Sequence, residues 1–487
     1  MDRGLLKALY LILMSLGLAL LFNFLFFGKA IGVSAFIFTA VLLMAVFLFG
    51  KYQKISFQKS WWLIILIGFF ALMPSIRESD FLTFLNVCAA LGLLMLLAHQ
   101  LAGTPAFVMK IIDYFALVFV VPFRMLIRAI ATLLMIGQVH SSVKNREIWL
   151  RIIKGVVMAL PILIILGLLF SMADLAFSEF VNNIITIDIS EHTAQYVALL
   201  IFAFVAGLSF LSYIYFPKQT IQTLPEKTDD VVRSNKRIEV IVFLGLISAL
   251  FLVFIIFQIT YLFGGENNII NAGFTYAEYA RRGFWELLAV AMLSLLVLLA
   301  SEKYAGAESK KDNHFTIPAL ILIAEVVIVI ISAFKRLSLY IDTYGMTELR
   351  FYVAGFIILL LALFILLGVK FIKSKQENFF AFGTLISVIA FLVIVNAINP
   401  DSFIIKSNIK QYNRTGKIDA SYIGILSADA EAGKIEVYGK LQGDDKMILG
   451  SYLLNQQEIL QDSSKHWQSA NVSRSKALTL LQQLESK

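Results

Sequence analysis

The sequence predicts an all-α integral membrane protein, a polytopic bundle of about eleven transmembrane helices with a small helical tail. Composition is the first reason: 59% of the 487 residues are apolar and 15% are charged, whereas soluble chains have about 45–50% apolar and about 25% charged residues. A water-soluble enzyme, a nucleic-acid-binding protein and a disordered chain are thereby excluded. The net charge of +8 reports orientation instead, because Lys and Arg collect in short cytoplasmic loops.

The lengths of the apolar runs are the second reason, since a helix needs about 20 apolar residues to cross the hydrocarbon core. The run at 61–75 is short, but Trp61 and Trp62 at its start are typical of a membrane interface. The first run is longer than the apolar part of a signal peptide, which has about 7–15 residues. The eleven predicted spans are 8–27, 31–50, 61–75, 81–98, 152–173, 195–216, 239–263, 284–300, 316–334, 350–370 and 379–397.

A twelfth run, 112–136, is interrupted by Pro122 and carries Arg124 and Arg128 on one helix face. If this run does not span and the N-terminus is inside, the inner segments hold 23 basic residues and the outer loops seven. A span here would move most of the inner basic residues to the outside, against the positive-inside rule. We therefore predict an interfacial helix whose two arginines contact lipid headgroups. A tilted structural helix packed under the bundle is the alternative.

These spans divide the chain into four parts. Residues 1–98 form a four-helix membrane module, and 99–151 a cytoplasmic connection containing the interfacial helix. Residues 152–397 form a seven-helix module, and 398–487 an extracytoplasmic helical tail, in which Gly443-Asp444-Asp445 is predicted to be a loop. The expected location is the cytoplasmic (inner) membrane, with the N-terminus inside and the C-terminus outside.

The sequence indicates neither a cofactor nor a metal centre. The single cysteine, Cys88, excludes an intrachain disulfide, and the five histidines are far apart. No His-Glu-x-x-His or Cys-x-x-Cys spacing occurs.

Three polar segments are predicted to meet at the outer face. The first precedes the span at 284 and the second precedes the span at 350, where Gly345 permits a tight turn and Thr347 is predicted to be the N-cap. The third follows the last span and includes Asn399, Asp401, Asn413, Asp419 and Tyr422. The candidate site residues are Tyr276, Glu278, Arg281, Arg282, Arg336, Tyr340, Asp342, Tyr344, Glu348 and Arg350.

Arginines and carboxylates gathered at one membrane face would suit an anionic lipid headgroup, a lipid-linked phosphate or another membrane or envelope protein. The competing interpretation is that these side chains fix loops and anchor the interface.

Glu325 lies in the middle of the apolar run 317–331. A charge at that depth costs about 2.5–3.5 kcal/mol on insertion scales. We expect Glu325 to be protonated or paired, with Gln258 or Thr260 as candidate partners. It would then be either an ion-coupling carboxylate or a neutral hydrogen-bonding group between helices.

Several segments resemble a bacterial multi-spanning membrane family catalogued as domain of unknown function 4173. The resemblance lies in 276–287, in 339–350, in Asn399-Pro-Asp and in Leu426-Ser-Ala-Asp-Ala430, and covers roughly 236–430. It implies a bacterial cytoplasmic-membrane protein and carries no activity or catalytic residues.

Three functions follow, in this order. A non-enzymatic sensing, scaffolding or interaction protein with a polar outer-face site ranks first, because no catalytic constellation is recognisable. A transporter using Glu325 is the second. A membrane-embedded transferase acting on a lipid-linked substrate is the third, with arginines binding phosphate and an acidic residue as base.

Overall fold

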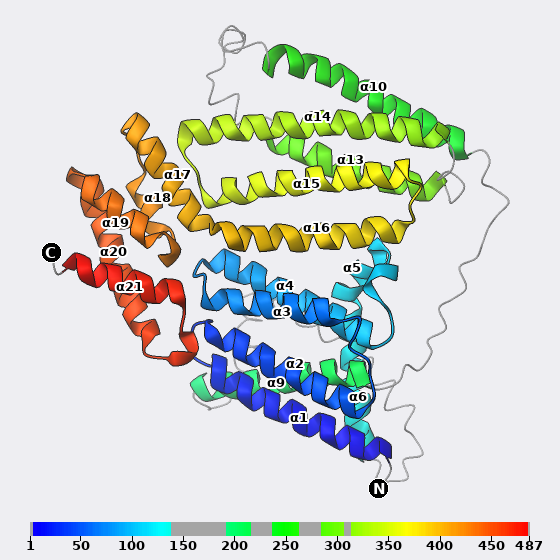
Figure 1. Ribbon diagram of the computed structural model, residues 1–487, viewed down its shortest axis with the longest axis vertical. Helices are drawn as coiled ribbons and strands as arrows, with labels where there is room; N and C mark the ends of the chain where they lie inside the picture. Colours follow the sequence, from blue (N-terminus) through cyan, green and yellow to red (C-terminus); the bar gives the residue numbers. More distant parts are fainter. Residues whose placement is uncertain (1–2, 138–190, 216–235, 263–283, 306–312, 486–487) are drawn as a thin grey trace, which may run out of the picture.

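The computed structural model describes residues 3–137, 191–215, 236–262, 284–305 and 313–485, and the regular structure in them is entirely helical (Figure 1). Within these residues, eight helices are long and apolar enough to cross a membrane, and a bent helix pair at 111–133 would make a ninth. The chain is therefore an integral membrane protein with an all-α fold.

One bundle contains α1 (Arg3–Phe26), α2 (Val33–Tyr52), α3 (Trp61–Leu72), α4 (Asp80–Leu101) and α9 (Glu191–Tyr215). These helices share one apolar core, to which α9 contributes Leu208, Leu211 and Tyr213. The sequence assigned the helix at 195–216 to the second membrane module, whereas its apolar side chains pack with the first four spans.

The second bundle contains α10 (Lys236–Leu262), α13 (Phe284–Ala305), α14 (Asn313–Tyr344), α15 (Glu348–Ile372) and α16 (Glu377–Ile398). Its core includes Leu322, Val326 and Phe364. α16 lies beside α4 and joins the two bundles (Figure 1). At that junction the buried amides of Asn86 and Asn396 exchange two hydrogen bonds, of 2.9 and 2.8 Å.

Eight of the eleven predicted spans coincide with helices that meet the length and hydropathy requirements of a span. Two others are helices with shorter apolar stretches, Trp61–Ser75 and Val240–Ile256. The predicted span at 152–173 lies outside the described residues.

The ambiguous run at 112–136 forms two helices, α5 (Ile111–Phe119) and α6 (Val121–Gly137), which meet at an angle of 48°. Pro122 explains the break, because its ring cannot continue a helix from the preceding turn. The pair runs across one end of the bundles (Figure 1). The Arg128 guanidinium donates to the backbone oxygen of Tyr213 at 2.6 Å and lies 4.3 Å from the centre of its ring.

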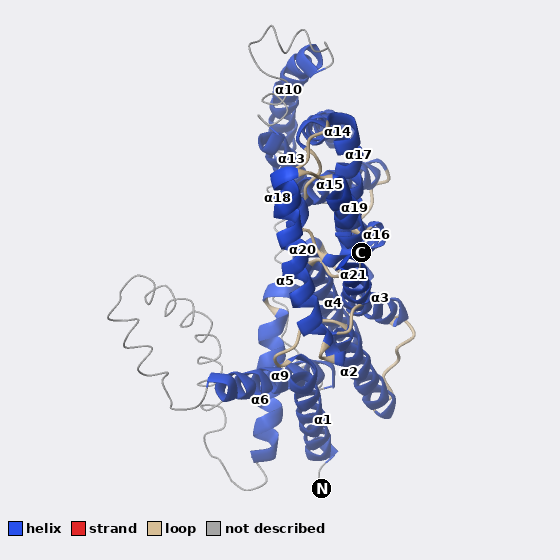
Figure 2. Ribbon diagram, turned by 90° about the vertical axis from the view of Figure 1, so that its left-hand side faces the viewer, coloured by secondary structure: helices blue, strands red, loops and turns tan. Residues whose placement is uncertain are grey.

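The opposite end of the bundles is covered by the C-terminal layer, residues 400–485. It comprises α17 (Pro400–Thr415), α18 (Ala420–Ile425), α19 (Glu431–Lys440), α20 (Gly443–Ser464) and α21 (Val472–Glu485). Ile404, Leu449 and Leu481 belong to its own apolar core. Figure 2 views the molecule from this end, and α20 crosses in front of the spans. The first helix begins at the far end, so the two termini lie at opposite ends of the bundle (Figure 1).

One local prediction in this layer is wrong. Gly443-Asp444-Asp445 forms the first turn of α20 and is not a loop. Gly443 takes the left-handed conformation, with φ +60°. The two aspartates stabilise the helix start because its exposed N–H groups carry partial positive charge.

Candidate functional site

Three segments distant in sequence meet where the C-terminal layer covers the ends of the two bundles. The first is the α3–α4 turn, residues 73–79, from the first bundle. The second is the α14–α15 turn, residues 345–347, from the second bundle. The third is the layer itself, which is bonded to both turns.

The contact with the α14–α15 turn depends on Asn408 of α17. Its side-chain oxygen accepts from the Met346 N–H, and its side-chain N–H donates to the Met346 carbonyl, both at 2.8 Å. Gly345 permits this close approach, because it has φ +83° and a Cβ there would lie 2.8 Å from the side-chain oxygens of Asn408 and Gln411. The tight turn predicted at Gly345 is confirmed.

The start of α15 is fixed in the same way. The Thr347 hydroxyl accepts from the Arg350 N–H at 3.4 Å, which is the predicted N-cap. The Glu348 N–H donates to the phenol oxygen of Tyr422 at 2.7 Å. Glu348 therefore begins its helix with its backbone bonded to α18 of the C-terminal layer.

The contact with the α3–α4 turn is a reciprocal pair of carboxylate bonds. The Glu78 side chain accepts from the Ala428 N–H at 2.9 Å, and the Asp429 side chain accepts from the Glu78 N–H at 2.8 Å. Arg474 of α21 lies 3.7 Å from the Glu78 carboxylate. The Asn471 side chain donates to the carbonyls of Pro74 and Arg77, at 2.8 Å each.

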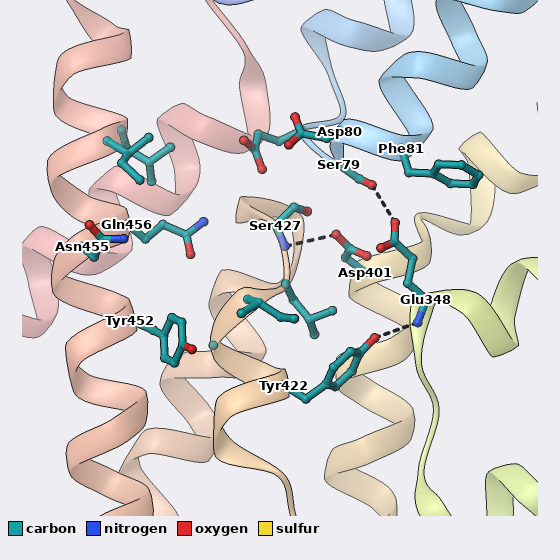
Figure 3. A pocket seen from close by; sticks show the side chains of 16 residues that line it. Ser79, Asp80, Phe81, Glu348, Asp401, Tyr422, Ser427, Tyr452, Asn455 and Gln456 are labelled. Atoms are coloured by element: carbon teal, nitrogen blue, oxygen red, sulfur yellow. Dashed lines mark hydrogen bonds between the residues drawn. The ribbon is translucent and has the colours of Figure 1, made fainter. Parts of the chain in front are cut away.

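A pocket of about 570 Å³ lies where these segments meet (Figure 3). Small-molecule sites have volumes of about 300–1,000 Å³. One wall is carboxylate-rich and the other carries amides, aromatic rings and aliphatic groups. The lining residues are Glu78, Ser79, Asp80, Phe81, Glu348, Asp401, Tyr422, Gly424, Ile425, Leu426, Ser427, Tyr452, Asn455, Gln456, Ile459 and Leu460.

Asp401 is the most buried of the four lining carboxylates, with 3% of its surface exposed. Its Oδ2 accepts from the Ser427 N–H at 3.2 Å, whereas its Oδ1 has no hydrogen-bond partner. In Figure 3, Asp401 lies between Ser427 and Glu348. The Glu348 carboxylate in turn accepts from the Ser79 hydroxyl at 3.4 Å.

Burial controls the protonation of these groups. Desolvation raises the pKa of Asp401, although its hydrogen bonds to Ser427 oppose the change. Desolvation likewise raises the pKa of Glu78 against the opposing effects of the Ala428 N–H and Arg474. The pKa of the Tyr422 phenol rises to about 12, mainly through burial. Tyr422 therefore keeps its proton at neutral pH and can donate it.

A buried ion pair lies next to the pocket. The Lys434 ammonium, fully buried, is 3.3 Å from the Glu431 carboxylate and donates to the side-chain oxygen of Gln456, which lines the pocket. Burial lowers the pKa of Lys434 and raises that of Glu431. The pair fixes Gln456 while Lys434 itself stays outside the lining.

Only some of the predicted outer-face residues meet here. Glu348, Asp401 and Tyr422 line the pocket. Arg350 does not: its guanidinium lies 4.2 Å from the centre of the Tyr340 ring and donates to the carbonyl oxygens of Tyr344 and Gly345. The four candidates Tyr276, Glu278, Arg281 and Arg282 lie outside the described residues.

The remaining candidates are spread over α14. Arg336 is buried in that helix, whereas Asp342 and Tyr344 at its end are exposed. The Tyr344 ring packs edge-on against Tyr340, with 5.0 Å between ring centres. None of these residues lines the pocket.

Glu325 is buried, and its carboxylate accepts from the Ser248 hydroxyl of α10 at 2.6 Å. The sequence suggested Gln258 or Thr260, whose side chains lie outside the described part of the structure. Arg124 is exposed on α6, while Arg128 contacts Tyr213.

Sequence reasoning did not select Glu78 or Asp80, and Asp429 entered only as part of the segment Leu426-Ser-Ala-Asp-Ala430 in the family resemblance. The signal was present in Arg77-Glu-Ser-Asp80, four polar residues between two apolar runs. Such a segment is typical of any exposed turn, however. Its role emerges only from the C-terminal layer, about 350 residues further along, which covers it.

The described residues contain no group of three or more His, Cys, Asp or Glu side chains placed to hold one metal ion. The four lining carboxylates therefore surround a space and do not converge on a point.

Comparison with known proteins gives one match. No curated protein and no solved structure matches the chain significantly. A family model described as domain of unknown function (DUF4153) matches residues 64–435, which include both turns and the C-terminal layer as far as the start of α19. The family expected from the sequence carried a different number, 4173. The match covers most of the 487 residues, and the chain belongs to the family of unknown function DUF4153.

Proposed function

We propose that this integral membrane protein is a non-enzymatic binding protein, a sensor or scaffold whose ligand occupies the pocket beneath the C-terminal layer. One observation carries the proposal: the pocket is formed jointly by both bundles and by the layer. A ligand there contacts Glu78, Glu348 and Tyr422 together. Its binding energy therefore favours the state in which the layer is docked.

We place this pocket at the outer face of a bacterial cytoplasmic membrane, with the N-terminus inside. The support is the excess of basic residues in the predicted inner segments. In this orientation, Arg124 of α6 faces the headgroups of the inner leaflet. A reporter fused after residue 487 should report the outer compartment, and cytoplasmic activity of that reporter would reverse the assignment.

The ligand proposed from the sequence, an anionic headgroup or lipid-linked phosphate, has less support than a cation. Neither Arg336 nor Arg350 lines the pocket, and the lining is acidic. A transferase acting on a lipid-linked phosphate needs cations at the transferred group. The charge of the pocket therefore favours the binding function over the transferase.

Binding can be tested without knowing the ligand. The purified full chain in nanodiscs would be heated with separate panels of amines, carboxylates, sugars and phosphates. We expect at least one class to raise the unfolding temperature of the wild type but not of an Asp401→Asn, Glu348→Gln double variant. If every class acts equally on both proteins, the pocket has no binding function.

A transporter remains the second candidate, because Glu325 is buried between α14 and α10 against Ser248. Buried intramembrane carboxylates are common in ion-coupled carriers. Glu325→Gln keeps the hydrogen bond but removes the titrating group. Ion-dependent uptake into vesicles that is lost in this variant would favour the transporter, and absence of such uptake in the wild type would remove it.

A further inference from the structure

The charge of the pocket restricts what can enter it. Four carboxylates line it, and no Lys, Arg or His does so among the described residues. Two basic groups that contact the lining residues Glu78 and Gln456 are already engaged: Arg474 is 3.7 Å from Glu78, and Lys434 is 3.3 Å from Glu431. An anion would therefore meet net repulsion from the lining, whereas a cation would be attracted.

The arrangement of Asp401 and Glu348 indicates where the positive charge of a bound cation would lie. Their carboxylates are neighbours in Figure 3 and act on each other electrostatically. Oδ1 of Asp401 is buried and has no hydrogen-bond donor. A buried acceptor without a donor costs about 1–3 kcal/mol. A cation that donates hydrogen bonds would satisfy Asp401 and relieve the repulsion together.

The size and the walls of the pocket indicate what the cation is attached to. A volume of about 570 Å³ is far larger than a bare ion needs. Tyr452 lies across the pocket from Asp401 in Figure 3. Ile459 also lines the pocket, two turns further along α20 and therefore on the same helix face as Tyr452. Apolar walls with a few convergent charged groups suit an organic ligand.

From these observations, we propose that the pocket binds a small organic molecule carrying a primary ammonium group. The ammonium lies between Asp401 and Glu348, and the hydrocarbon part lies against Tyr452 and Ile459. A primary ammonium has three N–H donors and can bond both carboxylates. This inference rests on the proposed binding function and adds the chemical class of the ligand.

The ammonium could belong to a dissolved amine or to the ethanolamine headgroup of a lipid. The chemistry at Asp401 and Glu348 is the same for both. Only the ethanolamine lipid brings a phosphate close to the acidic lining. The two sources are separated by changing the membrane composition while the amine in solution is kept constant.

The experiment uses the full chain in nanodiscs of phosphatidylcholine and phosphatidylglycerol, titrated with cadaverine at constant ionic strength. Butylamine, tetramethylammonium and sodium are the comparison cations. We expect cadaverine and butylamine to bind at least tenfold more tightly than tetramethylammonium, which has no N–H donor. Sodium at the same ionic strength should have no specific effect.

Variants then locate the binding. Asp401→Asn and Glu348→Gln should each weaken cadaverine binding at least tenfold. The matched control is Asp342→Asn, because Asp342 is an exposed carboxylate near the same turn and does not line the pocket; it should bind like the wild type. Circular dichroism and unfolding temperature confirm that each variant is folded.

A second set of nanodiscs contains phosphatidylethanolamine. If the lipid headgroup is the source of the ammonium, this lipid weakens cadaverine binding by competition; if the ligand is a dissolved amine, binding is unchanged. Either result supports the proposal, provided that Asp401→Asn abolishes the binding of the ammonium compound concerned.

Three results would overturn the ammonium assignment. They are equal effects of sodium and cadaverine, equal binding by wild type and Asp401→Asn, and no effect of any amine or ethanolamine lipid. Pocket-dependent stabilisation by a sugar or a carboxylate alone would also overturn it, while leaving the proposed binding function intact.

Discussion

Glu78 and Asp429, 351 positions apart, are joined by a hydrogen bond, and with the return bond from Ala428 to Glu78 it holds the first bundle to the C-terminal layer. The Asp429 carboxylate accepts from the Glu78 N–H at 2.8 Å, and the Glu78 carboxylate accepts from Ala428, the neighbour of Asp429, at 2.9 Å. The α3–α4 turn and the segment Ala428–Asp429 thus each supply one donor and one acceptor. Since the second bundle is bonded to the same layer at Met346 and Glu348, the layer bridges the two bundles.

The buried side chain of Asn471 should be essential to this docking. Asn471→Ala removes two hydrogen bonds to the carbonyls of Pro74 and Arg77, and a third that the Asn471 side-chain oxygen accepts from the Arg474 N–H at 3.0 Å. The loss should cost about 2–3 kcal/mol, because the carbonyls lose their donor while the layer still covers them. Hydrogen exchange across residues 400–485 should accelerate.

Ser451→Ala is the matched control, since the exposed Ser451 hydroxyl donates only to the carbonyl of Ile448 within its own helix. Its exchange should match that of the wild type. Unchanged exchange in Asn471→Ala would mean that the layer is held elsewhere.

Gly345→Ala tests the contact with the second bundle. The new methyl group would lie 2.8 Å from the side-chain oxygens of Asn408 and Gln411, in a backbone with φ +83°. The left-handed conformation alone costs about 1–2 kcal/mol, and displacement of Asn408 adds to it. Thermal unfolding should therefore show a clear loss of stability.

Gly416→Ala separates the two causes. Gly416 has φ +68°, but no atom lies within 4 Å of the position that a Cβ would take there. This variant should therefore show the backbone cost alone. If both variants lost equal stability, the contact between Gly345 and α17 would carry no energy.

The pair Glu431 and Lys434 should be strongly coupled. Lys434→Met leaves a buried carboxylate without its cation, which typically costs about 3–5 kcal/mol. The double variant Glu431→Gln, Lys434→Met removes both charges and should recover much of that loss. A double-mutant cycle by denaturant unfolding measures the coupling, and additive losses would refute it.

The docking of the layer should weaken as pH rises through the titration range of the carboxyls at its contact with the bundles. Burial raises the pKa of Glu78 above 4.5 and of Asp401 above 3.8, their ordinary values. Their favourable contribution is complete below the unfolded-state pKa and is lost as pH rises through the folded-state pKa. Proteolysis of the layer in the absence of added amine should therefore be slowest under mildly acidic conditions.

Asp401→Asn should reduce this pH dependence, because the asparagine amide does not titrate. Ammonium binding should show the opposite trend and tighten as pH rises, since it needs ionised carboxylates. Layer stability that increases from about pH 4 to about pH 7 in the absence of amine would contradict the assignment of Glu78 and Asp401.

Several local features were predictable because neighbouring residues determine them. The Thr347 cap and the turn at Gly345 follow from the hydroxyl and from the missing side chain. Pro122 marked the break in the run at 112–136. Gly443 misled the prediction, because glycine and aspartate are common both in loops and at helix starts.

The candidate site was only partly predictable. Glu348, Asp401 and Tyr422 were selected because they follow or precede predicted spans at one face. Arg350 was selected for the same reason, yet it stacks on Tyr340. Adjacency to a span places a residue at the membrane surface, but it does not determine which way its side chain points.

The sequence by itself determined that this chain is a helical membrane protein with a polar C-terminal segment, because the transfer free energy of a helix is a sum over its own residues. Only the tertiary structure decided that α9 joins the first bundle and that Glu78, Glu348 and Asp401 surround one pocket. Those relations depend on contacts between segments hundreds of residues apart, and a transfer free energy summed over the residues of one helix does not include such contacts.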